Sequence, residues 1–332
     1  MYKYLILHSG RVFLPGKRLG YIHHTTLEGH PMLDLCTLGT GGALPLPERG
    51  LASLYVRLNG RGLLIDCGES TQTAIRRIGW GFRAIDGMLI THFHADHCGG
   101  LPGLLLSMGK SGRDEPFHIW GGPGLHQVVG GLRVIAPQLP FPVVLHEMDG
   151  DTEEFTAIGL SVTAFRVDHS VPCYGYRLQL SRPPAFDPQK ARALGIPVTL
   201  WGKLQAGETV IHEGNTFRTE DVQGAAKSGL SFLYCTDTRP TPRIAEMGRG
   251  TDLMILEGMY GNEHKRPQAL KNRHMIFHEA ARLARDAGTK RLLLTHFSNC
   301  IDDPAEYLPE AQAIFPETQA AEDLLEIKLK FT

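Results

Sequence analysis

Short apolar runs recur along this chain, and each of them ends abruptly at a Gly, an Asp, a Glu or a His. They cover residues 33–38, 63–65, 88–91, 162–167, 232–236, 253–256 and 292–295. Stretches with helical character lie between them, at residues 69–78, 124–135, 275–287 and 304–314. Because strands that alternate with helices form apolar sheets covered by helices, the sequence predicts an α/β fold from about residue 32 onward.

The composition supports a large folded core and excludes several classes of protein. Hydrophobic residues make up 42% of the 332 residues and charged residues 21%, which excludes a disordered or collagen-like chain. The 34 Lys and Arg residues balance the 35 Asp and Glu residues, for a net charge of −1. Such a chain has no overall basic field, so a nucleic-acid partner would need a local basic patch.

Cysteine usage and hydropathy indicate the compartment. The six cysteines are scattered along the chain without a CxxC pair, and no apolar run approaches the ~18 residues of a membrane span. We therefore expect reduced thiols, no membrane association and a cytoplasmic protein.

The run at residues 88–91 leads into a histidine-rich motif that places four potential metal ligands within six residues. They are His92, His94, Asp96 and His97. One tetrahedral zinc ion bound by all four would keep no open position for a substrate. Two metal ions accommodate these side chains more easily. His92 and His94 would then bind one ion, and the other two residues would bind the second.

Three other strand ends supply the ligands that the two ions still lack, namely His169, Asp237 and His296. A carboxylate can bridge two cations, so we expect Asp237 to bind both and the two histidines to complete the sites. A single histidine at a strand end often only caps a turn, but seven such groups are costly to crowd together without a metal. A metal pair of this kind generates hydroxide near neutral pH and holds both oxygens of an in-line displacement.

With these ligands in place, the chain resembles the metallo-β-lactamase superfamily and, more closely, the ribonuclease Z family of tRNA 3′-processing endonucleases. The resemblance runs from about residue 32 to the C-terminus. Besides the histidine-rich motif it rests on LGTGG at 38–42, DCGESTQ at 66–72, GLPGLL at 100–105, DTRP at 237–240 and LTHFS at 294–298. The histidine-rich motif alone is typical of the whole superfamily, and the other segments are more specific.

The resemblance implies a four-layer αββα sandwich, a homodimer and two zinc ions, with manganese or iron as alternative metals. It also implies that Asp96 is both a ligand and the proton acceptor. Glu257 and His274 match a further pair of the family, in which the histidine can protonate the leaving ribose 3′-oxygen while the carboxylate holds its ring. The implied reaction removes the 3′ trailer of precursor tRNA, leaving a 3′-hydroxyl on the tRNA and a 5′-phosphate on the trailer.

Residues 181–206 interrupt the alternation and match the family's tRNA-binding arm in place. The basic residues that we expect to bind tRNA there are Arg182, Lys190, Arg192 and Lys203. Such charges are often only a solvated face, but beside a metal site that suits phosphodiesters we expect them to bind phosphates. Residues 1–31 form an N-terminal extension of uncertain role ahead of the nuclease domain at 32–332.

Two other functions stay open at this point. Relatives with the same scaffold hydrolyse small phosphodiesters, sulfate esters or thioesters, but they generally lack the basic arm and the Glu257–His274 pair. A non-enzymatic RNA-binding module is disfavoured because no ligand position is lost. Family members usually carry Thr where this chain has Ile276, and the arm tip at 196–199 lacks the usual Gly-Pro, so the exact RNA substrate stays open.

Overall fold

The computed structural model describes residues 33–182, 184–225 and 228–331 of the chain. The N-terminal extension predicted at residues 1–31 lies outside these residues. No helix in the described part of the chain is long and apolar enough to cross a lipid bilayer.

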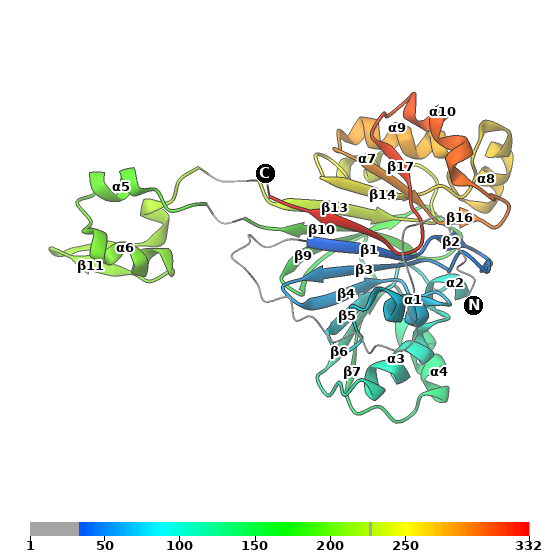
Figure 1. Ribbon diagram of the computed structural model, residues 1–332, viewed down its shortest axis with the longest axis horizontal. Coiled ribbons are helices and arrows are strands. Elements are labelled where there is room, and N and C mark those ends of the chain that lie inside the picture. The colour runs from blue at the N-terminus through cyan, green and yellow to red at the C-terminus, as the bar shows by residue number, and fades with distance from the viewer. Residues whose placement is uncertain (1–32, 183, 226–227, 332) are drawn as a thin grey trace, which may run out of the picture. The chain divides into compact units, whose positions relative to one another are not determined.

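Within the described residues, two seven-stranded sheets form the centre of the fold (Figure 1). The first sheet has the order β18 (Leu325–Leu329), β1 (Leu33–Gly39), β3 (Ser53–Leu58), β4 (Arg61–Ile65), β5 (Ile85–Leu89), β6 (Phe117–Gly121) and β7 (Val143–Glu147). The second has the order β17 (Thr318–Ala320), β15 (Leu292–Thr295), β14 (Leu253–Glu257), β13 (Leu230–Cys235), β10 (Cys173–Leu180), β9 (Leu160–Val167) and β8 (Thr152–Ala157). Both sheets are mixed. The strands β4, β5, β6 and β7 pair in parallel in the first sheet, and β13, β14, β15 and β17 pair in parallel in the second. The other neighbouring strands are antiparallel.

The two sheets pack face to face, and helices cover their outer faces. Side chains such as Val56, Tyr176 and Phe232 fill the space between the sheets. The first sheet is covered by α1 (Thr71–Ile78), α3 (Leu101–Lys110) and α4 (Leu125–Leu132). The second is covered by α7 (Pro242–Met247), α9 (Phe277–Ala287) and α10 (Leu308–Gln312). These layers confirm the predicted αββα sandwich.

Helix α9 shows how local sequence sets these elements. It buries Phe277, Ala280, Ala281 and Ala284 along one face, at the spacing of an amphipathic helix. It ends at Gly288, whose φ of 61° is the left-handed conformation that a glycine adopts most easily at the end of a helix. The helix thus packs tightly on β14 and β15, whose carboxyl ends lead into the site described below.

Shorter elements connect the strands and helices. They are β2 (Gly41–Gly42), its parallel partner β16 (Phe297–Ser298), α2 (Ala95–Cys98), α8 (Arg266–Asn272) and three 3₁₀ turns at η1 (Arg133–Ile135), η3 (Glu263–Lys265) and η4 (Pro304–Tyr307).

The insertion between β10 and β13 has a small core of its own. It contains α5 (Pro188–Ala193), α6 (Val198–Gln205), the hairpin of β11 (Val210–His212) and β12 (Asn215–Phe217), and the turn η2 (Thr219–Val222). Its buried residues are Ala191, Ile196, Leu204, Val210 and Val222. The arm predicted to end at residue 206 therefore continues to about residue 229, because the hairpin and the turn complete this core.

Candidate active site

The seven predicted metal ligands lie together at the carboxyl ends of strands from both sheets. His92 and His94 follow β5, and α2 directly after them carries Asp96 and His97. The other three residues follow strands of the second sheet: His169 comes after β9, Asp237 after β13 and His296 after β15. Parallel strands end at one edge of a sheet, so residues far apart in sequence meet there.

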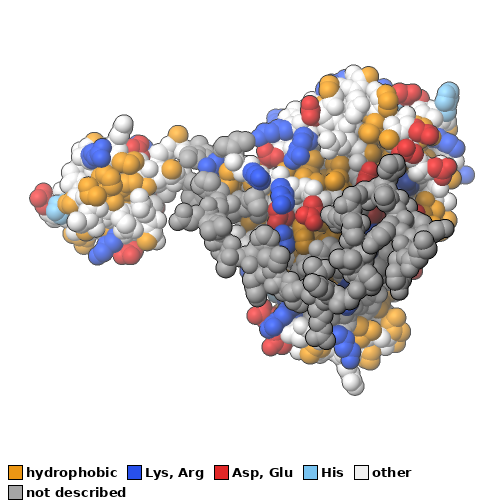
Figure 2. Space-filling view, in the orientation of Figure 1, with side chains coloured by type: hydrophobic (Ala, Val, Ile, Leu, Met, Phe, Trp, Pro, Cys, Tyr) orange, Lys and Arg blue, Asp and Glu red, His pale blue; other side chains and the backbone are white. Residues whose placement is uncertain are grey.

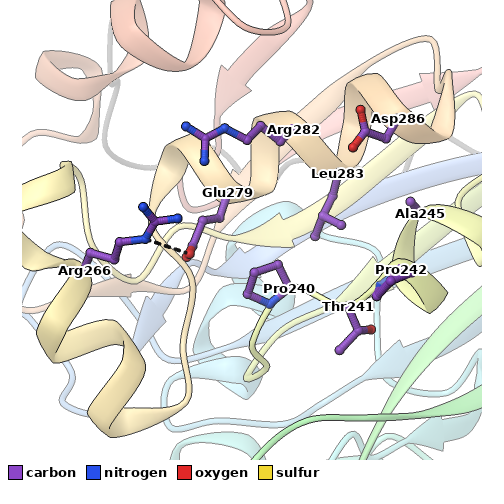
Figure 3. A pocket seen from close by; sticks show the side chains of 9 residues that line it. All are labelled: Pro240, Thr241, Pro242, Ala245, Arg266, Glu279, Arg282, Leu283 and Asp286. Atoms are coloured by element: carbon purple, nitrogen blue, oxygen red, sulfur yellow. Dashed lines mark ion pairs between the residues drawn. The ribbon is translucent and has the colours of Figure 1, made fainter.

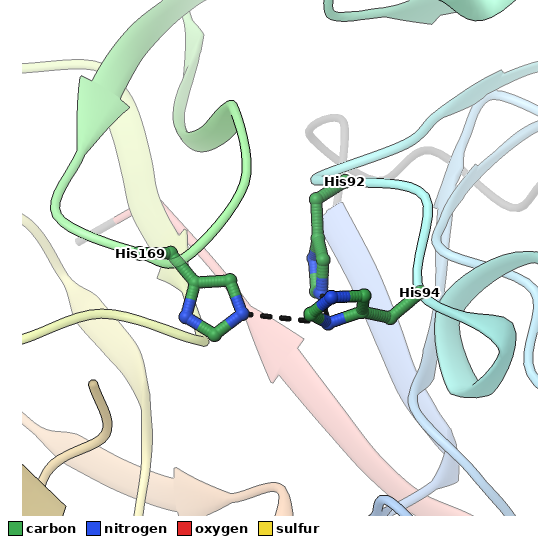
Figure 4. A group of neighbouring side chains, drawn as sticks. All are labelled: His92, His94 and His169. Atoms are coloured by element: carbon green, nitrogen blue, oxygen red, sulfur yellow. Dashed lines mark hydrogen bonds between the residues drawn. The ribbon is translucent and has the colours of Figure 1, made fainter. Parts of the chain in front are cut away.

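His92, His94 and His169 form the first group of potential ligands, and their ring nitrogens lie within 4.8 Å of one another. Nε2 of His92 lies 2.9 Å from Nδ1 of His94, and Nε2 of His169 lies 3.4 Å from the same atom. Figure 4 shows the three rings turned toward one another from two separate segments.

Asp96, His97 and His296 form the second group, again with ligand atoms within 4.8 Å of one another. Nε2 of His97 and Nε2 of His296 are 3.1 Å apart. Oδ2 of Asp96 lies 3.6 Å from the first of these nitrogens and 3.5 Å from the second. In these two groups, His92 and His94 of the motif lie together, and Asp96 and His97 lie together.

Asp237 lies between the two groups and turns one oxygen toward each. Its Oδ1 is 4.0 Å from Nε2 of His92, in the first group. Its Oδ2 is 3.2 Å from Nε2 of His97 and 3.2 Å from Nε2 of His296, in the second. This is the position that a bridging carboxylate would need.

The chemistry of the cluster fits divalent cations. Oδ2 of Asp237 is buried and has no hydrogen-bond partner among the described residues, although such an atom normally has one. Burial alone would lower the pKa of His97, but the charges of Asp237 and Asp66 raise it well above its ordinary value. The two carboxylates therefore favour positive charge beside them, and imidazole and carboxylate are ordinary ligands of zinc and related metals.

Two residues around the cluster orient its ligands. Asp66 is fully buried and binds Nδ1 of His97 at 2.8 Å, which turns the other ring nitrogen toward the centre. Asp66 also accepts hydrogen bonds from the backbone N–H and the hydroxyl of Thr91. The backbone N–H of Ala43 donates to Oδ2 of Asp96 at 2.7 Å. The loop after β1 thus borders the site.

Three of these residues adopt a left-handed backbone conformation directly after a strand. The φ angles are 62° at Asp66, 57° at Asp237 and 56° at His296. A residue other than glycine held in this region costs on the order of 1–3 kcal/mol, and such residues cluster at functional sites. The sharp turn brings each side chain into the cluster. Space is also limited there, since a Cβ added at Gly42 would lie 2.5 Å from the ring of His296.

Glu257 and His274 form a buried pair beside Asp237. Nδ1 of His274 lies 2.9 Å from Oε2 of Glu257, while Oε1 accepts the backbone N–H of Thr238 at 2.7 Å. Burial alone would lower the pKa of His274, but the charge and hydrogen bond of Glu257, with the charge of Asp237, raise it to about 9. The ring is therefore held as a proton donor at neutral pH.

A second ion pair, between Arg239 and Glu279, holds the backbone at His274. Arg239 donates to both carboxylate oxygens of Glu279 and to the carbonyl oxygen of His274. Glu279 also accepts the backbone N–H of Ile276 at 3.2 Å, and Arg266 approaches it to 3.5 Å across a surface pocket (Figure 3). Neither Arg239 nor Glu279 is predicted as a site residue from the sequence.

The cysteines near the motifs do not join the ligand groups. Cys67, Cys98 and Cys235 are buried, and burial raises the pKa of the Cys98 thiol to about 11. None of the His, Asp and Glu groupings found in the described residues includes a cysteine. These thiols act as small packing groups.

The four predicted phosphate-binding residues lie on the insertion. Lys190 and Arg192 are exposed on α5 and Lys203 is exposed on α6. Nζ of Lys190 donates to the carbonyl oxygen of Gln223 at 2.7 Å. The guanidinium group of Arg192 lies over the ring of Trp201, and that of Arg182 lies over the ring of Phe331. Figure 2 shows Lys and Arg side chains beside exposed hydrophobic ones on the visible face of the insertion. The acidic residues of the insertion fall mainly in its second half, at Glu208, Glu213, Glu220 and Asp221.

Comparisons with known proteins agree with this fold. The family model of the anti-Pycsar protein Apyc1 matches residues 33–127, and that of a β-lactamase superfamily domain matches residues 209–297. The crystal structure of human tRNase Z, short form, is similar with a TM-score of 0.64 and 24% identity, covering 89% of this chain and 98% of the human one. At that identity the likeness shows a shared fold.

Sequence relatives define the family. A ribonuclease Z from Lachnoclostridium phytofermentans is 47% identical over 300 residues, which cover 90% of this chain and 99% of the relative. A ribonuclease Z from Lachnospira eligens matches with the same identity and the same coverage. This similarity extends over nearly the whole chain and accompanies a β-lactamase-like fold with a cluster of metal-binding side chains. The chain therefore belongs to the ribonuclease Z family of metal-dependent hydrolases.

Proposed function

We propose that this chain is the endoribonuclease that removes the 3′ trailer of precursor tRNA, and that it does so with two zinc ions. The observation that carries the proposal is the position of Asp237, which turns one carboxylate oxygen toward each of two ligand groups. His92, His94 and His169 would hold one ion, and Asp96, His97 and His296 the other. Manganese or iron could use the same donors.

Two divalent ions held there would lower the pKa of bound water and neutralise the charge of the reacting phosphate. Asp96 would accept the proton of the attacking water. Burial raises its pKa, but the hydrogen bond from His296 and the charge of His97 outweigh that effect and lower the pKa, so the carboxylate is ionised. The N–H of Ala43 fixes one of its oxygens in place.

His274 serves the leaving group. When the bond between phosphorus and the ribose 3′-oxygen breaks, that oxygen takes the proton of His274 and becomes the 3′-hydroxyl of the tRNA. The phosphate stays on the 5′ end of the trailer. Glu257 stabilises the protonated ring before the transfer, and Thr238 holds Glu257 in place.

The insertion would bind the body of the tRNA through Arg182, Lys190, Arg192 and Lys203. Clustered Lys and Arg side chains neutralise phosphates, and exposed aromatic or apolar groups between them suit a folded RNA. The fold alone would equally allow a hydrolase of small phosphodiesters or sulfate esters. The insertion and the Glu257–His274 pair favour an RNA substrate. A non-enzymatic RNA-binding module would not need the complete cluster.

We also infer a homodimer that works in the cytoplasm. Exposed apolar side chains support a partner surface, since Val134 and Ile135 are 73% and 71% exposed on η1. All six cysteines lie in the described part of the chain and are unpaired, as is usual in a reducing compartment.

Replacing the insertion tests the assignment of the substrate. Leu180 and Leu230 face each other in the antiparallel pair of β10 and β13, so a short turn can join these strands directly and replace residues 181–229. None of the seven ligands is removed. Cleavage of precursor tRNA should then fall mainly through a higher KM, while hydrolysis of bis-p-nitrophenyl phosphate should persist, because this small ester cannot reach the insertion.

A milder variant controls for damage by the deletion. Changing Arg182, Lys190, Arg192 and Lys203 to Gln keeps the insertion and removes four of its six Lys and Arg charges. The dependence of log K for tRNA binding on log salt should become shallower by about 0.7–0.9 for each phosphate that the variant no longer neutralises. If both variants bind and cut precursor tRNA like the intact chain, the insertion is not the tRNA-binding element.

A further inference from the structure

A pocket of about 400 Å³ opens beside the two residues that would handle the protons. Its walls come from the loop after β14, from α8 and from the loop after β16, and include Tyr260, Asn262, Lys265 and Asn272. Cavities of a few hundred Å³ are typical of sites for small molecules or for single building blocks of a polymer. None of these four residues belongs to the ligand cluster.

Two residues of the pocket lining contact the residues that would handle the protons. Ala43 lies at one side of it, and the N–H of this residue binds Asp96. Tyr260 lies at the other side, with its ring edge-on to that of His274 and the two ring centroids 6.4 Å apart. Under the proposed function, Asp96 and His274 flank the phosphate that is cut. The nucleotides on either side of that phosphate must therefore pass the mouth of the pocket.

The lining has the chemistry that recognises a nucleobase. Single-stranded bases are bound by stacking on aromatic rings and by hydrogen bonds to their edges, which amide side chains can provide. Here Tyr260 supplies a ring whose hydroxyl accepts a hydrogen bond from Nδ2 of Asn272 at 2.8 Å. That interaction leaves the hydroxyl proton of Tyr260 available to a ligand. Lys265 is exposed at the rim and can approach a phosphate.

The side chain of Asn262 adds a hydrogen-bond acceptor that has no donor. Its Oδ1 is buried and has no hydrogen-bond partner among the described residues. Buried polar atoms are nearly always paired, and Asn262 lines the pocket, so a small rotation of its side chain would let a ligand there supply the missing donor. An N–H group at the edge of a nucleobase is such a donor.

We propose that this pocket binds the base of one nucleotide next to the cut, by stacking on Tyr260 and by a hydrogen bond to Asn262. The inference rests on the proposed function, because it takes an RNA strand across the metal cluster as given. It assigns to these two residues the choice of which nucleotide can flank the cleavage site.

The test uses precursor tRNA that lacks one base. Two substrates carry an abasic nucleotide, one at the last position of the tRNA and one at the first position of the trailer, and an unmodified substrate serves as reference. The proteins are the intact chain, Tyr260→Ala, Asn262→Leu and Leu270→Ala. Leu270 lies on α8 like Asn272, is 57% exposed and does not line the pocket, so the last variant is a matched control.

On the unmodified substrate, Tyr260→Ala should lower kcat/KM about 5- to 150-fold, the usual range for removal of one stacking side chain. Asn262→Leu should lower it by a smaller factor, and Leu270→Ala should leave it unchanged. On one of the two abasic substrates the intact chain should be as slow as the variants, because the base that the pocket binds is missing. The identity of that substrate assigns the base.

Two results would overturn the inference. In one, Tyr260→Ala and Asn262→Leu cut the unmodified substrate as fast as the intact chain does. In the other, they lose the same factor on both abasic substrates, which would mean that they disturb the reaction centre and bind no base. If the intact chain did not cut precursor tRNA but still hydrolysed bis-p-nitrophenyl phosphate, the proposed function itself would fail, which is a distinguishable outcome.

Discussion

Replacing Glu257 by Gln should slow the cleavage of RNA much more than the hydrolysis of an activated ester. The carboxylate is fully buried and its two oxygens bind His274 and the N–H of Thr238. A glutamine side chain has the same shape but no charge, so the protonated ring of His274 loses its stabilising partner. Only a leaving group that needs a proton should respond to this loss.

The expected loss of cleavage rate follows from the hydrogen bond between the side chains of Glu257 and His274. A hydrogen bond to a charged group contributes about 1.5–3 kcal/mol and a neutral one about 0.5–1.5 kcal/mol, so the substitution should cost on the order of 1–2 kcal/mol. That corresponds to a rate of RNA cleavage that is roughly 5- to 30-fold lower. Removing the ring itself, in His274→Ala, should lower the rate by about 10²- to 10⁴-fold, the usual contribution of general acid catalysis.

Single-turnover cleavage of precursor tRNA and hydrolysis of bis-p-nitrophenyl phosphate make the comparison. Nitrophenolate leaves as a stable anion, so both variants should hydrolyse this ester at nearly the intact rate. His278→Ala is the matched control, because His278 lies on the neighbouring helix, pairs with Glu310 at 3.1 Å and belongs to no ligand group. Equal losses on the two substrates would refute the role of His274 as the acid.

Two further substitutions test the cluster. Asp96→Ala should lower the turnover of both substrates by more than roughly 10³-fold, because one residue both holds a metal and accepts the proton. Circular dichroism should show that the fold is intact. Near-normal rates would place the base elsewhere. Gly42→Ala should weaken metal binding by about 10- to 100-fold in a competition with a chelator, because the new Cβ would lie 2.5 Å from the ring of His296; unchanged affinity would show that the ring can move freely.

The strand-end residues could be predicted from the sequence because one rule covers them. Apolar runs that stop at His or Asp identify strands that run in the same direction, and the carboxyl ends of such strands bring those residues to one edge. Asp66 follows the same pattern and could have been found in the same way. It acts through the ring of His97 and is not in a ligand group of its own, so a search for metal ligands passes over it.

Other parts of the site carry no local pattern. The N–H of Ala43 is a backbone group, so no residue type marks it. The pairing of Arg239 with Glu279 joins residues 40 positions apart, and only the packing of α9 brings them together. The helix α3 is also not predicted, because the glycines of this segment disfavour helix locally while tertiary burial of its leucines supports it. For the same reason the end of the insertion depends on its own core.

The metal content of the intact chain tests the central claim most directly. After dialysis against metal-free buffer, elemental analysis should give about two equivalents of divalent metal per chain, and Asp237→Ala should lose metal together with activity. Removal by a chelator should abolish cleavage of precursor tRNA, and adding zinc back should restore it as the second equivalent binds. Full activity at one equivalent per chain, or full metal content in Asp237→Ala, would contradict a pair of ions bridged by this carboxylate.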